Sequence, residues 1–246
     1  MPEGPSLVLF QEELLQFKGK KIMVANGTVK TIDPQLLKGR TIKGVLTWGK
    51  HLLFYFGSDL TLRVHFLMFG KYYINKKRAS PPQLHLVFDD KTAVNFYTCS
   101  IKYIEQPLED IYDWQTDVMS KEWDAKYVRK LIKQQPPETL VCDLLLDQDI
   151  FTGVGNIIKN ETLYRVHIHP ESQLGHLPPA QLTALIHEAV HFSYDFLRWR
   201  KAHQLTANLQ VHEQKTCPIH GTPLQKQDTG KLKRRSYWCE ECQKLS

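Results

Sequence analysis

The sequence feature that most constrains the fold is a set of four metal-binding side chains near the end of the chain. They follow the spacing C-x2-H-x18-C-x2-C and are Cys217, His220, Cys239 and Cys242. Two close pairs of soft or borderline ligands suit a tetrahedral Zn²⁺ ion in a closed structural site. Roughly thirty residues cannot bury a core of their own. We therefore expect one structural Zn²⁺ to hold together a β-hairpin that turns at residues 228–230.

The return strand of this expected hairpin is basic. It carries Lys231, Lys233, Arg234 and Arg235. A stiff hairpin can carry a guanidinium deep into a groove or an active site, although contact with phosphates alone would explain the same residues. The whole chain has a formal net charge of +6. This excess favours a polyanionic partner, with a solvated basic face as the alternative.

The remaining cysteines and the apolar pattern indicate the compartment. Cys99 and Cys142 are isolated in apolar surroundings, which is not the pattern of a disulfide framework and indicates a reducing compartment. No apolar run approaches the ~20 residues of a membrane helix. Charge, Gly and Pro interrupt the N-terminus too early for a signal peptide. We expect a protein that is not secreted and has no membrane partner. It would work either in the cytoplasm of a bacterium, in association with the nucleoid, or in a nucleus.

The first half of the chain reads as a helix followed by short strands. Apolar side chains recur at helical spacing from Leu7 to Phe17, which predicts a helix over 5–18. From about residue 21 to 104 the pattern changes to short runs rich in β-branched and aromatic residues. These runs are 44–48, 51–56, 60–66, 71–74, 84–88 and 93–97. Short strands separated by turn residues predict an antiparallel sandwich or barrel.

The second half is helical after an irregular connection at 105–121. Helices are expected at 122–134, 138–147 and 156–165, and a longer one runs from Pro178-Pro179 to about Lys201. In the loop 148–155, two glycines permit a tight turn and close approach of the backbone. The helix that follows offers amide donors to phosphate, and Asn156 would add a side-chain donor. A plain helix–turn–helix hairpin explains this segment, including Glu161, equally well.

Two segments of the first half carry further candidate contacts. Lys50 stands between Gly49 and His51 just ahead of an expected strand, where a solvated lysine is the simpler interpretation. Met68, beside Phe69 in the segment 65–70, could wedge between bases. Apolar residues in such a segment are more often part of the core, and the local sequence does not decide between the two.

The N-terminus offers a nucleophile if Met1 is removed. Processing would leave a free secondary amine on Pro2, and an α-amine titrates near pH ~8. Such an amine can attack an aldehyde-like sugar carbon and form an iminium. Glu3 lies next to it as a candidate proton donor or acceptor. Met-Pro is also an ordinary way to start a protein, so this motif gains weight only beside other catalytic groups.

Five segments occur together and in one order along the chain. They are MPEGP at 1–5, GKHLL at 49–53, LLDQ at 145–148, GVGNI at 153–157 and the terminal metal-binding hairpin. Over essentially the whole chain this pattern resembles the formamidopyrimidine-DNA glycosylase/endonuclease VIII family. The α+β fold then expected has an N-terminal antiparallel β-sandwich with an N-terminal helix, and a helical helix–two-turn–helix domain that ends in a zinc-finger β-hairpin. The expected domains are 1–118, 119–215 and 216–246.

The resemblance implies a catalytic role for four residues. Pro2 would be the Schiff-base nucleophile at the deoxyribose C1′, and Glu3 would be the proton donor and shuttle. Lys50 would serve β-elimination and phosphate contact. Arg234, on the finger, would serve δ-elimination. Arg235 adjoins it, so the finger assignment could slip by one position, although the spacing to Cys239 favours Arg234.

The resemblance also implies a set of DNA contacts. Asn156 would contact phosphate, and Met68 would fill the gap left by a flipped-out base. Glu161 would support the site as a buried glutamate near the catalytic amine. Lys233 and Arg235 would add contacts from the finger to the DNA.

Three departures from the family pattern bear on the branch and the substrate. His220 stands where the family usually has Cys, which a tetrahedral site tolerates. The stretch 97–102 lacks the Arg-Phe pair of the formamidopyrimidine branch. The segment 201–209 is short compared with the loop that covers 8-oxoguanine in that branch. The last two differences favour the endonuclease VIII branch and oxidised pyrimidines.

The function implied is that of a bifunctional DNA glycosylase and abasic-site lyase of base-excision repair. It would act as a monomer on damaged duplex DNA, and β- and δ-elimination would leave a one-nucleotide gap with phosphates at both ends. One alternative is a non-catalytic, zinc-dependent DNA-binding protein of the same fold. The other is the same enzyme acting mainly on oxidised purines such as 8-oxoguanine and formamidopyrimidine.

Overall fold

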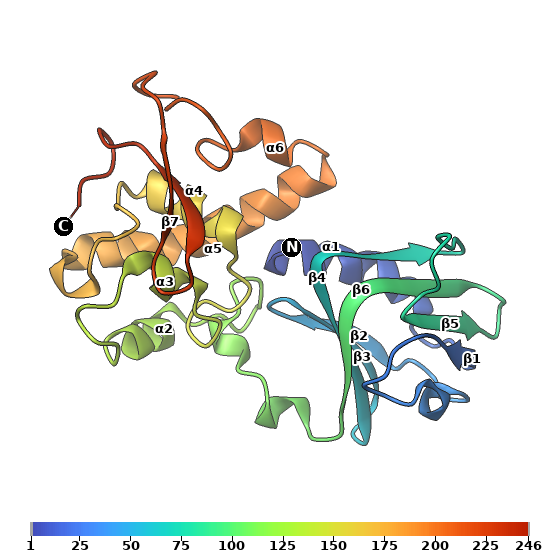
Figure 1. The fold of residues 1–246 in the computed structure, drawn as a ribbon. Coiled ribbons are helices and arrows are strands. Elements are labelled where there is room, and N and C mark those ends of the chain that lie inside the picture. The colour runs from blue at the N-terminus through green and yellow to red at the C-terminus, as the bar shows by residue number, and fades with distance from the viewer. Residues whose placement is uncertain (1, 246) are drawn as a thin grey trace. The chain divides into compact units, whose positions relative to one another are not determined.

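The computed structural model describes residues 2–245 and divides the chain into two units, Met1–Asp113 and Trp114–Ser246. Figure 1 shows the first unit as mainly strands and the second as mainly helices. The predicted domain limits at 118 and 215 stay predictions. Within the described residues, no helix has the combined length and apolar character that crossing a bilayer requires.

The first unit begins with helix α1 (Gly4–Leu14), which continues as a 3₁₀ turn over Leu15–Phe17. Pro5 lies in its first turn, where a missing N–H leaves no helical hydrogen bond unmade. The apolar face predicted from the sequence is buried, with Leu7 and Leu14 fully covered. The side-chain amide of Gln11 donates to the Val45 carbonyl at 2.8 Å, which ties the helix to the sheet.

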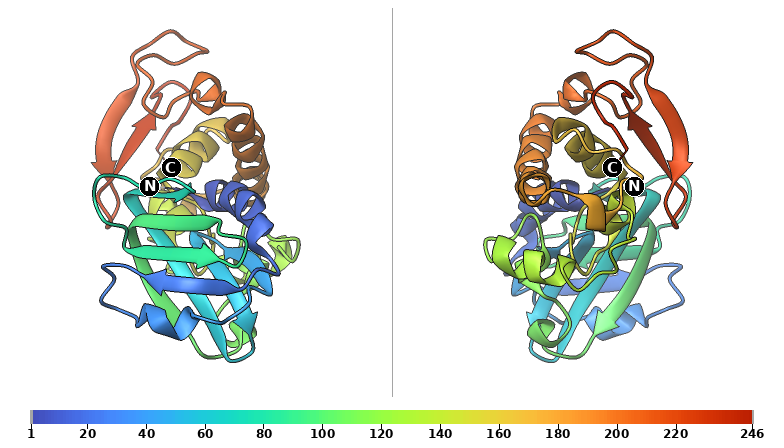
Figure 2. Two further views of the ribbon diagram at one scale, coloured as in Figure 1. Left: turned by 90° about the vertical axis from the view of Figure 1, so that its right-hand side faces the viewer. Right: turned by 90° about the vertical axis from the view of Figure 1, so that its left-hand side faces the viewer.

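Six antiparallel strands form one hydrogen-bonded sheet in the order β1-β5-β6-β4-β3-β2. The strands are β1 (Ile22–Asn26), β2 (Gly44–Trp48), β3 (His51–Gly57), β4 (Leu60–Ile74), β5 (Leu84–Phe88) and β6 (Ala93–Ile104). The two long strands, β4 and β6, run through both layers of a sandwich (Figure 2). Phe54 of β3 meets Phe96 of β6 edge-on across the core, with ring centroids 5.8 Å apart.

The predicted strands 60–66 and 71–74 are one strand interrupted by a bulge. Phe66 pairs with Cys99 and Lys71 with Tyr97, so the residues between them have no partner on β6. Gly70 permits this, because an added Cβ would lie 2.6 Å from the Thr98 carbonyl oxygen. The bulge is therefore a local consequence of the extra residues 67–70 and of the glycine that closes them.

Over residues 114–245, the second unit packs five α-helices and a hairpin. Its elements are α2 (Ala125–Ile132), α3 (Val141–Leu146), α4 (Asn156–Arg165), α5 (Pro179–Lys201), α6 (Leu205–Asn208), β7 (Gln225–Thr229) and β8 (Arg234–Trp238). Its core joins apolar residues of α3, α4 and α5, among them Leu145, Ile158 and Phe192. The fold class predicted from the sequence, an N-terminal β-sandwich followed by a helical domain with a terminal hairpin, is confirmed.

Several boundaries in the second unit differ from the predictions. Helix α2 begins three residues later than expected because the Asp124 carboxylate accepts the Lys126 and Tyr127 N–H groups as its cap. Helix α3 begins at Val141, whose N–H donates to Ser172 and not to a helical carbonyl. Helix α6 and the 3₁₀ turn at Trp114–Thr116 were not predicted, and neither was the 3₁₀ turn at Leu108–Asp110 at the end of the first unit.

The terminal hairpin turns later than predicted. Thr229 pairs with Arg234, so the turn is residues 230–233 and not 228–230. Lys231 and Lys233 consequently lie in the tip, and only Arg234 and Arg235 of the expected basic set belong to the return strand. The cause is the left-handed backbone at Gly230 (φ +69) and Lys233 (φ +45), which closes the turn there.

Candidate active site and nucleic-acid interface

Pro2 and Glu3 directly precede helix α1. Glu3 is the helix N-cap residue, and its carbonyl accepts the Ser6 N–H at 2.8 Å and the Leu7 N–H at 3.3 Å. Glu3 is buried, whereas Pro2 is half-buried. Pro2 and Glu3 are thus fixed to a partly buried helix, which would hold an amine at Pro2 in one place. The predicted removal of Met1 concerns a residue outside the described part of the chain.

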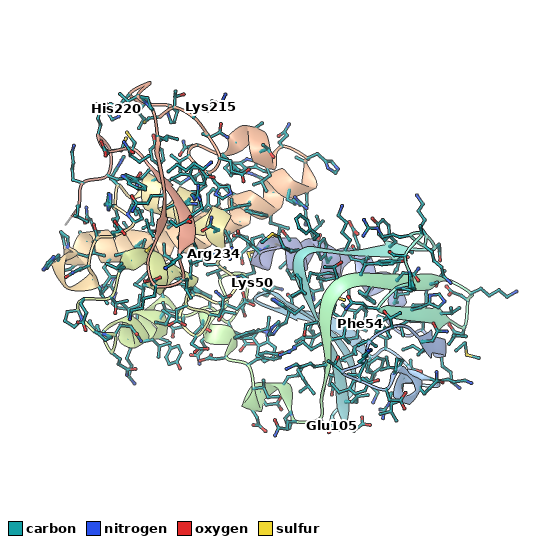
Figure 3. The ribbon with its side chains drawn as sticks, in the orientation of Figure 1. Lys50, Phe54, Glu105, Lys215, His220 and Arg234 are labelled. Carbon is teal, nitrogen blue, oxygen red and sulfur yellow. The ribbon has the colours of Figure 1, made fainter. Side chains whose placement is uncertain are left out.

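Lys50 occupies the two-residue turn between β2 and β3. Trp48 and His51 are the last paired residues, and Gly49 has φ +50, as tight hairpin turns require. Nδ1 of His65, on strand β4, donates to the Lys50 carbonyl at 3.1 Å. Figure 3 shows Lys50 at this turn. A hairpin turn that is also bound from the neighbouring strand presents the lysine on a rigid support.

An aromatic and histidine cluster lies next to this turn. The rings of Trp48 and Tyr112 stack at 4.7 Å, and His51 Nδ1 lies 3.1 Å from the Tyr112 hydroxyl. Burial, with the nearby charges of Arg63 and Lys50 and with His65, lowers the pKa of His51 to about 3. His51 is therefore neutral at neutral pH. Sequence reasoning did not find this cluster, although His51 pairs directly with His65 across two neighbouring strands.

The β4 bulge displays three apolar side chains to solvent. Leu67, Met68 and Phe69 are 43%, 62% and 74% exposed. Exposure on this scale is unusual for large apolar residues next to a core strand, and it favours the contact interpretation of Met68 over the core interpretation. The gap-filling role itself stays a prediction.

In the second unit, the start of α4 is bound to the return strand of the hairpin. The Arg235 carbonyl accepts from Asn156 Nδ2 at 2.8 Å, from Lys159 Nζ at 3.2 Å and from Asn160 Nδ2 at 3.2 Å. Lys159 is fully buried and also donates to Ser236 Oγ at 2.8 Å. One helix therefore supplies three donors to a single backbone oxygen of β8. The phosphate contact expected of Asn156 stays a prediction.

Glu161 is fully buried on the same helix and organises a loop. Its carboxylate accepts the N–H groups of Gln210 (2.9 Å), Val211 (2.9 Å) and His212 (2.8 Å). Glu161 is buried on a helix, as the resemblance implied, and its supporting function stays a prediction. Its proposed relation to the catalytic amine stays a prediction.

The two finger arginines differ in their partners. Arg235 Nε donates to Asp228 Oδ1 on β7 at 2.5 Å, an ion pair that raises the arginine pKa. Arg234 is exposed and forms no ion pair or hydrogen bond through its side chain with any of residues 2–245. Figure 3 shows it on β8. Of the two, Arg234 is the guanidinium without an acidic partner among residues 2–245. Its assignment as the finger arginine stays a prediction.

Cys217, His220, Cys239 and Cys242 bring their ligand atoms within 4.8 Å of one another. Cys217 Sγ lies 3.7 Å from Cys242 Sγ and 3.7 Å from His220 Nδ1, and Cys242 Sγ lies 3.3 Å from His220 Nδ1. Metal–ligand bonds of about 2.0–2.3 Å arranged tetrahedrally give ligand separations near 3.5–3.8 Å. The four residues therefore form a potential metal site whose spacing suits Zn²⁺, as predicted.

Sequence reasoning missed several side chains whose contacts are distant in the chain. Lys159 and Asn160 touch β8 across more than 70 positions, and Asp143 of α3 accepts the Lys231 N–H at 2.9 Å. His212 bridges toward Asn160, with its Nδ1 3.0 Å from the amide nitrogen, and burial lowers its pKa to about 4. The buried Lys159 and Asn160 of α4 were the available signal, because a polar side chain needs a partner when it is buried.

Two family models match the chain. The formamidopyrimidine-DNA glycosylase N-terminal domain matches residues 1–99, and the formamidopyrimidine-DNA glycosylase H2TH domain matches residues 115–194. Endonuclease 8-like 3 of Xenopus laevis is 34% identical over 224 residues, covering 86% of this chain and 36% of the relative. Endonuclease 8-like 2 of Mus musculus is 25% identical, covering 99% of this chain and 96% of the relative. The chain thus spans about a third of one relative and nearly all of the other.

Solved structures share the fold. A viral DNA glycosylase superimposes with a TM-score of 0.85 at 19% identity, covering 98% of this chain and 99% of that one. The formamidopyrimidine DNA glycosylase of Lactococcus lactis, solved bound to DNA containing an AP site, gives a TM-score of 0.85 at 23% identity with the same coverage. The fold is therefore common to these proteins and to this chain.

Proposed function

Because the chain belongs to the formamidopyrimidine-DNA glycosylase/endonuclease VIII family, on its endonuclease VIII-like side, we propose that it is a DNA glycosylase and abasic-site lyase that removes oxidised bases from duplex DNA. The observation that carries the proposal is Pro2 at the start of the buried helix α1, with Glu3 as its cap residue. Once Met1 is removed, an imino acid fixed in this way would be a nucleophile held by the protein core.

The proposed chemistry begins at the sugar of the damaged nucleotide. The Pro2 nitrogen attacks C1′, the bond from C1′ to the base breaks, and a proton delivered through Glu3 leaves with the base. The Pro2 nitrogen then loses its proton, the bond from C1′ to the ring oxygen O4′ breaks, and that oxygen takes up a proton. The product is an iminium between Pro2 and the opened sugar. Loss of a C2′ proton then expels the 3′ phosphate in β-elimination, and a second elimination expels the 5′ phosphate.

The cationic groups assist the phosphate departures in this proposal. Lys50 on its hairpin turn and Arg234 on β8 each stabilise negative charge on a leaving phosphate, Arg234 in the second elimination. Flipping the nucleotide out of the duplex costs a few kcal/mol, and least at damaged bases, which supplies part of the selectivity. Met68 on the exposed bulge would occupy the vacated stack, with Asn156, Lys233 and Arg235 as further DNA contacts.

The metal site is proposed to hold one structural Zn²⁺. The ligands would be Cys217, His220, Cys239 and Cys242, and the ion would fix the fold of the finger without taking part in the chemistry. Oxidised pyrimidines are the proposed lesions, because residues 97–102 lack an Arg-Phe pair and 201–209 is short. We further propose a monomer that works in the cytoplasm or the nucleus.

Borohydride trapping tests the proposal. Processed protein mixed with DNA containing an abasic site should form a covalent adduct on reduction, and the Pro2→Gly variant should form much less. A panel of duplexes carrying thymine glycol or 8-oxoguanine should show faster excision of the pyrimidine. A protein that binds DNA and forms no adduct would instead be a non-catalytic member of the fold. Faster excision of 8-oxoguanine would assign it to oxidised purines.

A further inference from the structure

The tip of the hairpin is attached to helix α3 by one carboxylate. Asp143 Oδ2 accepts the Lys231 N–H at 2.9 Å, although the two residues are 88 positions apart. An added Cβ at Gly230 would lie 2.3 Å from Asp143 Oδ1, so the carboxylate packs directly against the turn. Gly230 also has φ +69, which a side chain would strain. Contact with Asp143 and backbone conformation both call for a glycine at this position.

This attachment fixes the backbone just before Arg234 and so sets where its side chain begins. The turn is short: the Lys233 N–H donates to the Gly230 carbonyl at 3.2 Å, and Arg234 pairs with Thr229 immediately after it. A displacement of Lys231 would therefore be passed on to Arg234 within three residues. On the other side, the Arg235 carbonyl is held by donors from α4. Arg234 lies between an anchor on α3 and an anchor on α4.

The metal site is at the other end of the hairpin. Strand β8 begins at Arg234 and ends at Trp238, directly before the ligand Cys239. Figure 3 shows His220 and Arg234 toward opposite ends of the finger. A metal ion there fixes the base of the hairpin, whereas the tip depends on other contacts. Asp143 supplies such a contact from a rigid helix of the core.

We propose that Asp143 is a positioning residue that latches the hairpin tip and so aims the Arg234 guanidinium for the second elimination. The proposal rests on the proposed function of Arg234. It assigns Asp143 no contact with DNA and no proton transfer. Its effect is confined to the step that needs Arg234, so formation of the Pro2 adduct should not depend on it.

The first test separates the two eliminations. In Asp143→Ala, the ratio of δ- to β-elimination product should fall on the order of tenfold, as loss of one charge-assisted hydrogen bond of about 1.4 kcal/mol predicts. Borohydride trapping and metal content should stay at wild-type values. Asp143→Asn keeps an oxygen that accepts the Lys231 N–H, and it should restore most of the ratio. A purely structural defect would instead lower trapping and both products together.

The second test uses the contact with Gly230. Gly230→Ala should disturb the tip twice, through the strained φ and through the clash with Asp143. In the double variant with Asp143→Ala the clash is gone, so adding Gly230→Ala should change the product ratio less than it does in the wild type. The strained φ of an alanine at position 230 is the same whether residue 143 is Asp or Ala. It therefore cancels when the four proteins are compared as a double-mutant cycle. Purely additive effects would contradict a direct contact between the two residues.

The outcomes distinguish the latch from the enzyme. A wild-type protein that makes δ product, together with an Asp143→Ala variant of unchanged product ratio and unchanged hydrogen exchange at the Lys231 amide, would overturn the latch alone. A wild-type protein that makes β product but no δ product would overturn the assigned role of Arg234, and the latch with it. A protein that traps no abasic-site DNA would contradict the proposed function as a whole.

A second, independent feature is a basic loop in the first unit. Residues 75–83 connect β4 to β5 and carry Lys76, Lys77 and Arg78, all exposed. None of the three forms an ion pair within residues 2–245. Three consecutive cations without acidic partners produce a local positive field that attracts a polyanion.

The base of this loop is fixed by hydrogen bonds, among them those of the buried Asn95. Asn75 and Ala93 exchange hydrogen bonds at 2.9 and 2.8 Å, and Asn95 Nδ2 donates to the Lys76 carbonyl at 2.8 Å. Asn95 is in turn 2.7 Å from His85, and both side chains are buried. A buried, satisfied network of this kind specifies one conformation of the backbone that it binds.

Arg78 is held by aromatic rings. Its N–H donates to the Tyr97 hydroxyl at 3.0 Å, and its guanidinium lies 5.7 Å from the Tyr97 ring centroid and 5.9 Å from that of Tyr73. A guanidinium stacked on rings keeps its donors free for phosphate oxygens. We infer that this loop is a contact site for the phosphate backbone of DNA, independent of any lesion.

The salt dependence of binding to undamaged duplex DNA tests this site. Each phosphate contact adds about 0.9 to the slope of log K against log salt. The triple variant Lys76→Gln, Lys77→Gln, Arg78→Gln should therefore lower the slope by between about 0.9 and 2.7. A matched variant of exposed lysines elsewhere in the unit, Lys18→Gln, Lys38→Gln and Lys102→Gln, should change it less. Equal slopes for the two triple variants would overturn the inference.

Discussion

The two units hold their candidate catalytic groups in different ways. In the first, Pro2 and Glu3 precede a helix, Lys50 lies in a two-residue turn and Met68 in a bulge, so each position follows from a few neighbouring residues. In the second, Arg234 lies on a short hairpin whose backbone is bound by helices 75 to 88 positions away in the chain. Local sequence therefore sets the first group of positions, and tertiary contacts set the second.

Metal removal should separate the units most clearly. Structural Zn²⁺ contributes roughly 10–16 kcal/mol to small zinc-dependent folds. Chelation, or Cys217→Ser, should therefore unfold the region 217–242 and expose Trp238, while the sheet of the first unit stays protected from hydrogen exchange. Exchange measured by mass spectrometry on fragments of both units checks this. Loss of protection in β3 and β4 would show that the two units are not independent in this respect.

Loss of the Glu161 carboxylate should be the next largest effect. In Glu161→Ala three backbone N–H groups of residues 210–212 lose their acceptor, and each buried unpaired donor costs about 1–3 kcal/mol. We expect a loss of at least about 3 kcal/mol in the free energy of unfolding of the second unit, measured by chemical denaturation. Glu188→Ala, which removes a half-buried carboxylate on α5, is the control and should cost less. Equal losses in the two variants would mean that the bonds from Glu161 to residues 210–212 stabilise the unit no more than an ordinary half-buried carboxylate does.

A substitution at Gly70 tests whether neighbouring residues set the β4 bulge of the first unit. A Cβ there would lie 2.6 Å from the Thr98 carbonyl and 2.9 Å from the Leu67 nitrogen, and neither backbone atom can move cheaply. Gly70→Ala should destabilise the unit by about 1–3 kcal/mol and displace the bulge. Gly44→Ala is the matched control, since its Cβ would meet only the Tyr55 side chain at 4.0 Å. Denaturation curves for the two variants check the difference.

The smallest expected effect is a pH dependence in the first unit. The pKa of His51 is about 3 in the folded protein and near 6.5 when unfolded. As pH falls from 6.5 toward 3, the unfolded chain takes up a proton that the folded chain does not, so the free energy of unfolding decreases. His51→Gln should remove this part of the pH dependence. Denaturation at pH 7.5, 6 and 5 measures it, and parallel profiles for variant and wild type would contradict it.

The sequence predicted features that depend on neighbouring residues and missed those that depend on contacts distant in the chain. Periodicity and turn residues located α1, β2, β5, α4 and α5 closely, and ligand spacing located the metal site. The hairpin turn was misplaced because Gly230 and Lys233, not Asp228, adopt the left-handed backbone. The partners of Lys159 and Asp143 were not predictable, because nothing near them in the chain resembles Arg235 or Lys231. Packing decides those contacts, and periodicity carries no information on them.

The central claim is that the amine of Pro2 is the nucleophile, and peptide mapping of a trapped complex tests it most directly. Processed protein is reduced with borohydride on abasic-site DNA, digested and analysed by mass spectrometry. The account predicts that the DNA-derived mass is found on the peptide that begins at Pro2. A modified Lys50 with an unmodified N-terminal peptide, or no adduct at all from a metal-loaded sample, would contradict it.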